Sequence, residues 1–124
     1  MAAPNIVNVT TIIGKTTYAA LTTTLTTVLL ANSAASGKVF KINSIMVANV
    51  DGTNAADVTI DINTAAAGSG TSYALASTIS VPADATLNLI DKNSSFYLEE
   101  DKSIIGGASA NSDLEVVISY EEIN

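Results

Sequence analysis

Apolar and polar residues follow the period of extended strands most clearly between residues 38 and 63. Residues 57–63 alternate strictly, which is typical of a strand with one buried and one solvated face. Its alternating apolar residues are Val58, Ile60 and Ile62. Residues 39–50 are dense in β-branched and large apolar side chains, and residues 51–54 contain the glycine and asparagine that favour a chain reversal. We therefore expect the two stretches to pair as a hairpin.

The first stretch of this predicted hairpin, residues 39–50, is apolar on both of its faces when it is extended. Its apolar residues are Phe40, Ile42, Met46 and Ala48 on one face and Val39, Ile45 and Val47 on the other. Such a strand is either central in a covered sheet or lies against a second subunit. Both alternatives stay open from the sequence, so Val39, Ile45 and Val47 are candidate interface residues.

Shorter apolar runs separated by turn residues predict further strands. Residues 17–32 carry leucines at helical spacing, but the threonines between them favour a strand, because threonine loses rotamer freedom in a helix. Residues 65–72 predict a flexible exposed loop, and Gly106 with Gly107 predicts a bulge or a close approach of backbones. The remaining predicted strands cover residues 5–13, 73–81, 87–89, 96–98, 104–108 and 114–123. Eight or nine short strands and no convincing helix predict an all-β fold, an antiparallel two-sheet sandwich or jelly roll.

Composition narrows the classes of function. The 124 residues, of which 48% are hydrophobic and 14% charged, fit one domain with its own core. No apolar run is long enough for a membrane helix, and the N-terminal residues give no sign of a secretory signal. Cysteine, histidine, tryptophan and arginine are absent, which removes thiolate and imidazole chemistry. The net charge of −7 disfavours nucleic acid and anionic membranes as partners, and nothing in the chain indicates a cofactor.

Two groups of acidic residues are candidates for chemistry, and each has a simpler interpretation. Residues 99–101 are adjacent carboxylates in a turn, whereas acid and base catalysis needs two carboxylates that face each other across a substrate. Asp51, Asn54 and Asp57 could offer oxygen ligands to calcium, but their spacing does not match the regular twelve-residue loop. We therefore expect a solvated turn and no metal site.

The four tyrosines could form a platform that stacks on sugars. They are Tyr18, Tyr73, Tyr97 and Tyr120. Two of them fall on buried faces of the predicted strands, so we expect core and rim residues instead of a platform.

Four motifs carry a resemblance to a known family within residues 29–123. They are the segments SGKVFKINSIMVANVDGT, ADVTIDIN, TISVPADATLNLI and FYLEEDKSIIGGASANSDLEVVISYEEI. In this order they resemble the small β-sandwich virion proteins of tailed bacteriophages, in particular those of marine and cyanobacterial phages. Asp84 stands where that family usually has the glycine of a turn, which concerns the turn geometry alone. The resemblance implies a non-catalytic component of the virion, made in the bacterial cytoplasm.

The same sandwich serves at several places in phage particles, so the resemblance leaves several functions open. We expect a capsid decoration or cement protein that binds the major capsid protein on the outer shell. A basic surface on the shell would complement the acidic rim of this chain. The alternatives are a neck, tail or fibre-attachment component that binds other virion proteins, and a host-glycan-binding adhesin module; an enzyme ranks last.

The edges of the predicted sheets indicate self-association. Soluble monomers blunt open edges with prolines, bulges or inward charges, and this chain has only two prolines and five lysines. We expect a homo-oligomer, with a trimer preferred because a closed ring suits threefold sites on an icosahedral shell. Residues 1–13 are predicted to form an arm between subunits. Together with Val39, Ile45 and Val47, the candidate interface residues are Ile6, Val7, Val9, Ile12 and Ile13.

Overall fold

The computed structural model describes residues 4–124, so residues 1–3 of the predicted arm lie outside the described residues. The described chain forms nine strands and one turn of 3₁₀ helix. The strands are β1 (Ile12–Ala20), β2 (Val28–Asn32), β3 (Val39–Asn49), β4 (Ala56–Asn63), β5 (Ser72–Val81), β6 (Thr86–Ile90), β7 (Phe96–Leu98), β8 (Lys102–Ala108) and β9 (Leu114–Ile123). The 3₁₀ turn, η1 (Lys92–Ser94), lies between β6 and β7 and is capped by the Asp91 side chain.

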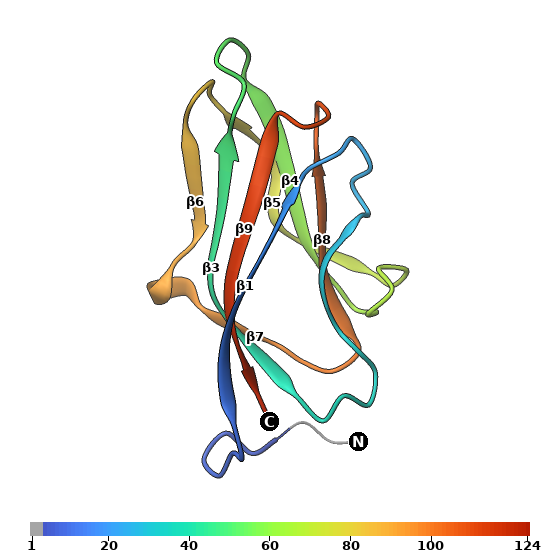
Figure 1. Cartoon of the computed structure of the whole chain (residues 1–124). Coiled ribbons are helices and arrows are strands. Elements are labelled where there is room, and N and C mark those ends of the chain that lie inside the picture. The colour runs from blue at the N-terminus through green and yellow to red at the C-terminus, as the bar shows by residue number, and fades with distance from the viewer. Residues whose placement is uncertain (1–3) are drawn as a thin grey trace.

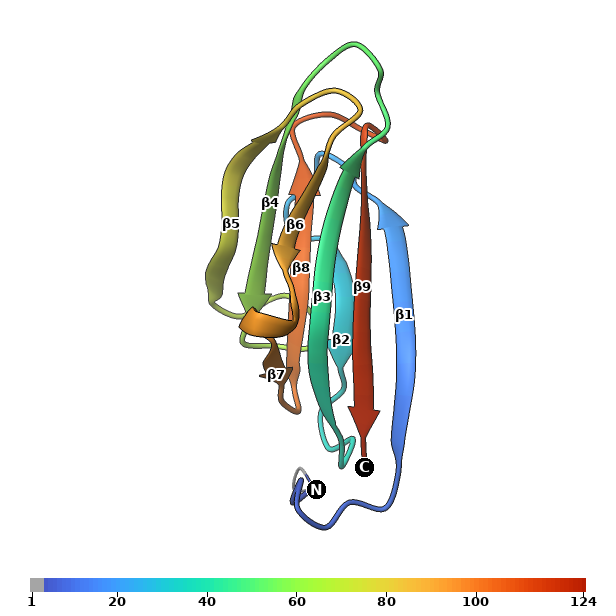
Figure 2. The ribbon, with the colours of Figure 1, turned by 90° about the vertical axis from the view of Figure 1, so that its left-hand side faces the viewer.

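The strands form two antiparallel sheets (Figures 1 and 2). The first sheet has the order β1-β9-β3-β6, with β7 also paired to β3, and the second has the order β2-β8-β4-β5. Apolar side chains from both sheets meet in one core, where Ile45 and Ile118 of the first sheet and Ile60 and Ile104 of the second are fully buried. The predicted all-β, two-sheet sandwich is confirmed.

The predicted hairpin of residues 38–63 is wrong, because β3 and β4 belong to different sheets. β3 pairs with β9, β6 and β7, whereas β4 pairs with β5 and β8. The connection between β3 and β4 crosses from one sheet to the other, which turns the apolar faces of the two strands toward the same core. A hairpin would have placed both strands in one sheet and left each apolar face to find another cover.

The two-sided apolar pattern of β3 is resolved by a bulge. Its register with β9 shifts between Ile42 and Ser44, so the buried side chains are Phe40 and Ile42 before the shift and Ile45 and Val47 after it. One extra residue exchanges the two faces of a strand. Val39, Ile45 and Val47 are 6%, 0% and 0% exposed, which removes these three predicted interface residues from the surface.

The first two strands differ from their predicted bounds. β1 begins at Ile12 and continues through Gly14 and Lys15, where the sequence had indicated an end. The predicted strand over residues 17–32 divides into the end of β1, a loop and β2, because residues 21–27 lie against β8 instead of pairing as a regular strand. Gly107 of β8 allows this close contact, because a Cβ there would lie 2.7 Å from two carbonyl oxygens of the loop. The predicted close backbone approach is confirmed.

Three strands end in a buried asparagine that anchors the loop after it. They are Asn32 of β2, Asn49 of β3 and Asn63 of β4. The Asn49 amide donates to the carbonyls of Asn54 and Val81, at 3.0 and 2.9 Å. The Asn63 amide donates to the Gly70 carbonyl, and its own oxygen accepts from the Gly70 N–H. The loop of residues 65–72, predicted to be a flexible tip, is therefore tied to the sandwich.

Candidate interaction surface

β1 is a strand without a buried residue, and only Thr17 on it is half-buried. It pairs with β9 over nine residues without a shift in register. Within residues 4–124 no other strand pairs with β1, so one of its two edges is open. Figure 2 shows β1 as the outermost strand on its side of the molecule. Lys15 is its one charged residue.

The hydrogen bonds at both ends of β1 show which backbone groups point to the open edge. Thr11 and Asn124 exchange two bonds of 3.1 and 2.9 Å, and the Leu21 N–H donates to the Leu114 carbonyl at 2.8 Å. Hydrogen-bonded pairs in an antiparallel ladder recur every second residue, so odd-numbered residues of β1 bond to β9. The even-numbered residues direct their N–H and C=O groups to the open edge. They are Ile12, Gly14, Thr16, Tyr18 and Ala20.

The chain before β1 places exposed apolar side chains at the end of the molecule where β1 begins. The Thr10 N–H donates to the Asn124 carbonyl at 2.6 Å, and the Asn5 side chain accepts from the Val7 N–H at 3.0 Å. Ile6 and Val7 are 53% and 90% exposed. A shallow depression of about 250 Å³ lies beside this segment. It is lined by Pro4, Ile6, Val39, Tyr97 and Glu99.

A charged cluster lies on the inner side of β1. Glu122 of β9 is 8% exposed and accepts from Lys15 at 3.0 Å and from Lys38 at 2.6 Å. The hydrogen bonds from Lys38 and Lys15 hold the pKa of Glu122 below its usual value, and the bond to Glu122 raises the pKa of Lys15. The cluster fixes the Lys15 side chain toward β9 and away from the open edge.

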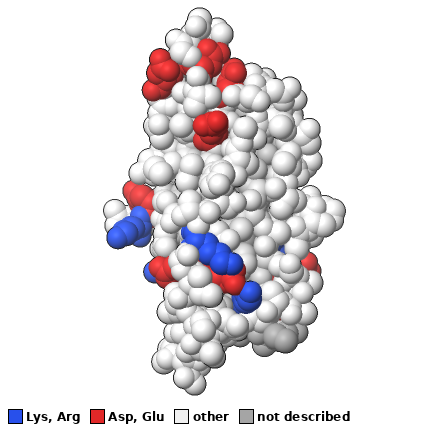
Figure 3. Space-filling model, viewed as in Figure 1, with Lys and Arg blue, Asp and Glu red and all other residues white. Residues whose placement is uncertain are grey.

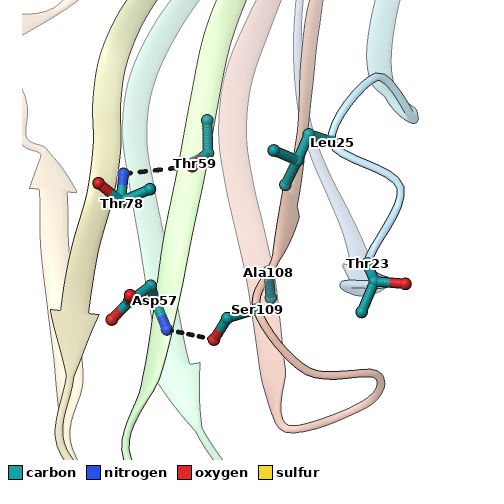
Figure 4. Close-up of a pocket in the computed structure, with 7 residues that line it drawn as sticks. All are labelled: Thr23, Leu25, Asp57, Thr59, Thr78, Ala108 and Ser109. Atoms are coloured by element: carbon teal, nitrogen blue, oxygen red, sulfur yellow. Dashed lines mark hydrogen bonds between the residues drawn. The ribbon is translucent and has the colours of Figure 1, made fainter.

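A shallow groove of about 280 Å³ lies on the outer face of the second sheet (Figure 4). Two of its hydroxyls already accept backbone bonds: Ser109 accepts from the Asp57 N–H at 2.8 Å, and Thr59 accepts from the Thr78 N–H at 3.2 Å. The groove is lined by Thr23, Leu25, Asp57, Thr59, Thr78, Ala108 and Ser109. One carboxylate among threonines supplies no acid and base pair.

The candidate acidic residues have local structural contacts. The Glu100 carboxylate accepts from the Gly37 N–H at 3.2 Å, and Asp101 accepts from the Ala66 N–H at 3.3 Å. Asp51 accepts from the Thr53 N–H at 2.8 Å and from the Asn54 N–H, which lowers the pKa of its carboxyl. Asp57 is placed elsewhere, in the groove of the second sheet.

Only one of the four tyrosines is buried, so the expectation of two is wrong. Tyr120 packs in the core with its ring centroid 5.1 Å from that of Phe40. Tyr18, Tyr73 and Tyr97 are 77%, 64% and 47% exposed. They lie on β1, β5 and β7, and they form no aromatic pair among the described residues.

Charge is unevenly distributed over the surface. Carboxylates gather at the end of the molecule drawn at the top of Figure 3, and much of the remaining face is uncharged. The loops at that end contain Asp51, Asp84 and Asp113. The described residues include no group of three or more carboxylates placed to hold a metal ion.

No protein-family model, curated protein or solved structure matches this chain. None of the helical structure in residues 4–124 is long and apolar enough to cross a membrane.

The most distinctive surface is the open edge of β1 together with the apolar segment before it. The sequence prediction included Ile6, Val7, Val9, Ile12 and Ile13 of this surface. It missed Gly14, Thr16 and Tyr18, because a glycine followed by a lysine is typical of the end of a strand.

Proposed function

We propose that this protein is a non-catalytic structural component of a tailed-phage particle, and that it is a capsid decoration or cement protein bound to the major capsid protein. The resemblance of residues 29–123 supports the phage particle. The observation that carries a binding role is the exposure of Ile6, Val7, Ile12 and Ile13 at the end of the molecule where β1 begins. Exposed apolar surface of this kind marks contacts between proteins.

A neck, tail or fibre-attachment component is the alternative, and it would use the same surface. Copy number in the particle separates the two. The number of copies of this protein per virion can be measured from stained gels of purified virions, with the major capsid protein as the reference. A decoration protein should be present in hundreds of copies per particle. A ratio of a few copies per particle would overturn the decoration role in favour of the neck or tail.

Binding to shells that lack this protein tests the surface itself. We expect Ile6→Ser to weaken binding, because it removes an exposed apolar side chain from the proposed contact. Val50→Ser is the matched control, since Val50 is also 53% exposed but lies in the β3–β4 loop at the opposite end of the molecule (Figure 1). Equal binding by both variants would contradict the proposed surface.

The trimer stays a prediction from the sequence, and the twofold pairing proposed below is the alternative to it. Ile45 and Val47 lie in the core, and Val39 is 6% exposed beside Ile6. The contacts of a trimer would therefore fall to the predicted residues before β1 and at its start.

A further inference from the structure

We propose that the open edge of β1 pairs with the same edge of a second copy of this chain, antiparallel about a twofold axis through Thr16. This pairing would join the two first sheets into one continuous sheet. It is independent of where in a particle the protein acts. It requires that β1 be a competent edge, that its backbone and side chains fit their own symmetry mates, and that charge permit the approach.

The other three sheet edges are interrupted. β2 and β6 have five residues each, and each shifts register against its neighbour. β5 has ten residues but shifts register twice against β4, and Thr78 within it has a φ of +49°. Bulges and short strands blunt edges against further pairing. β1 is nine residues long and without a shift, so it is the edge that can accept another strand.

The backbone of β1 fits itself. Its even-numbered residues present their N–H and C=O groups to the open edge, as the bonds at Thr11 and Leu21 fix. An antiparallel partner centred on Thr16 places Thr16 opposite Thr16, Gly14 opposite Tyr18 and Ile12 opposite Ala20. Each of these is a hydrogen-bonded pair, which exchanges two N–H···O bonds. The register therefore satisfies every open backbone group from Ile12 to Ala20.

Gly14 and Tyr18 supply the second fit. A Cβ added at Gly14 would meet nothing within 4 Å, and Gly14 does not have a positive φ. Nothing within the described chain therefore requires glycine in this strand, where it costs strand stability. Tyr18 is 77% exposed. In the proposed register each Tyr18 ring covers the Gly14 of the other copy, an arrangement that stabilises glycine on strand edges.

Charge permits the approach of two acidic chains at this edge. The single charged residue of β1, Lys15, is bound by Glu122 of its own chain at 3.0 Å. In the proposed register Lys15 faces Thr17 of the other copy, so the two lysines are not opposite each other. The loops that contain Asp51, Asp84 and Asp113 lie at the end of the molecule, away from the centre of the strand.

A charge exchange at the twofold axis tests the proposal. Thr16 is exposed in the single chain and would lie opposite itself in the dimer. We expect the wild-type protein to sediment as a reversible dimer over a dilution series. T16D and T16K should each sediment as monomers, because like charges meet across the axis. An equimolar mixture of T16D and T16K should recover the dimer. T86D is the matched control, since Thr86 is an exposed threonine on β6, the other edge of the same sheet, and it should stay dimeric.

A cysteine variant tests the same axis without depending on affinity. The chain has no cysteine, so T16C would provide the one thiol. Cα atoms of a hydrogen-bonded pair lie about 5.5 Å apart, within the range of a disulfide. We expect a T16C dimer on a non-reducing gel under mild oxidation and none with T86C. A wild-type monomer with no T16C cross-link, a trimer, or T16D and T86D that behave alike with no recovery on mixing would each overturn the twofold pairing.

Discussion

β1 and β9 run side by side in full register, yet their burial is opposite. β9 contains three glutamates and still buries six of its ten residues, whereas β1 contains one charged residue and buries none. The difference lies in position: β9 has β1 on one side and β3 on the other, and its inner face meets the core. Whether an apolar side chain is buried depends on the strands that surround its own strand and not on that strand's composition.

The largest expected difference between the two strands is in the cost of replacing an isoleucine by aspartate. Ile118 of β9 is 0% exposed and Ile12 of β1 is 57% exposed. Ile118→Asp should destabilise the protein by more than about 4 kcal/mol and leave it unfolded, because an unpaired carboxylate would enter the core. In the T16D monomer, where no second copy covers the strand, Ile12→Asp should change the free energy of unfolding by less than about 0.5 kcal/mol. Urea denaturation followed by circular dichroism measures both, and similar losses would contradict the comparison.

Glycines of a central strand and of the edge strand provide the next contrast. A Cβ at Gly106 of β8 would lie 2.5 Å from the Thr59 carbonyl oxygen, whereas a Cβ at Gly14 meets nothing within 4 Å. Gly106→Ala should cost about 2–3 kcal/mol, since overpacking forces the two backbones apart. Gly14→Ala should leave the thermal midpoint of the T16D monomer unchanged or raise it slightly. A fall as large as that of Gly106→Ala would show a contact that Gly14 makes in the single chain.

The contact between the two strands at Glu122 should contribute less. Glu122→Gln removes a carboxylate that accepts from Lys15 and Lys38, whose side chains are 44% and 35% exposed. Because solvent screens both lysines, we expect a loss of about 1–2 kcal/mol in the free energy of unfolding. Lys41→Gln is the control, since it removes a lysine outside this cluster. A loss for Lys41→Gln equal to that for Glu122→Gln would reject a specific contribution of the cluster.

The same carboxylate predicts a pH dependence. The pKa of Glu122 is lower in the folded protein than in the unfolded chain, chiefly because Lys38 and Lys15 bond to it. Its contribution is therefore complete above the ordinary glutamate pKa and is lost as the pH falls through the lowered folded value. Thermal unfolding between neutral and acid pH should show a shallower decline for Glu122→Gln than for the wild type. Parallel curves would contradict the assignment.

The smallest effect concerns Asp61, which contrasts with its neighbour Ile60 in β4. Burial raises the pKa of Asp61, so its ionised form opposes folding at neutral pH and its protonation on acidification relieves that cost. Asp61→Asn should be neutral or stabilising by a few tenths of a kcal/mol, about the scale of surface changes. Ile60→Asp, at a position that is 0% exposed, should unfold the domain. If both variants melted alike, the faces of β4 would be assigned wrongly.

The pattern of side chains determined the class of fold and the facing of regular strands. The alternation of Val58, Ile60 and Ile62 predicted the inner face of β4, where Val58 and Ile60 are buried and Ile62 is half-buried. The same alternation runs along the buried face of β9 through Leu114, Val116, Ile118 and Tyr120. These predictions succeed because the period of two follows from backbone geometry within each strand and needs no knowledge of partners. Ile6, Val7, Ile12 and Ile13 are exposed, and their role as contacts stays a prediction.

Tertiary structure alone decided which strands pair. Residues 51–54 look like a reversal within one sheet, yet the chain crosses to the other sheet there, since nothing local distinguishes the two kinds of turn. The bulge near Ser44 is likewise set by pairing with β9, and it moved Ile45 and Val47 from a predicted interface into the core. Glu122 forms ion pairs with Lys15 and Lys38, which are distant from it in sequence and come close to it only in the folded sandwich. Pairing depends on what each edge and face can bury together, and that is a property of the whole sandwich.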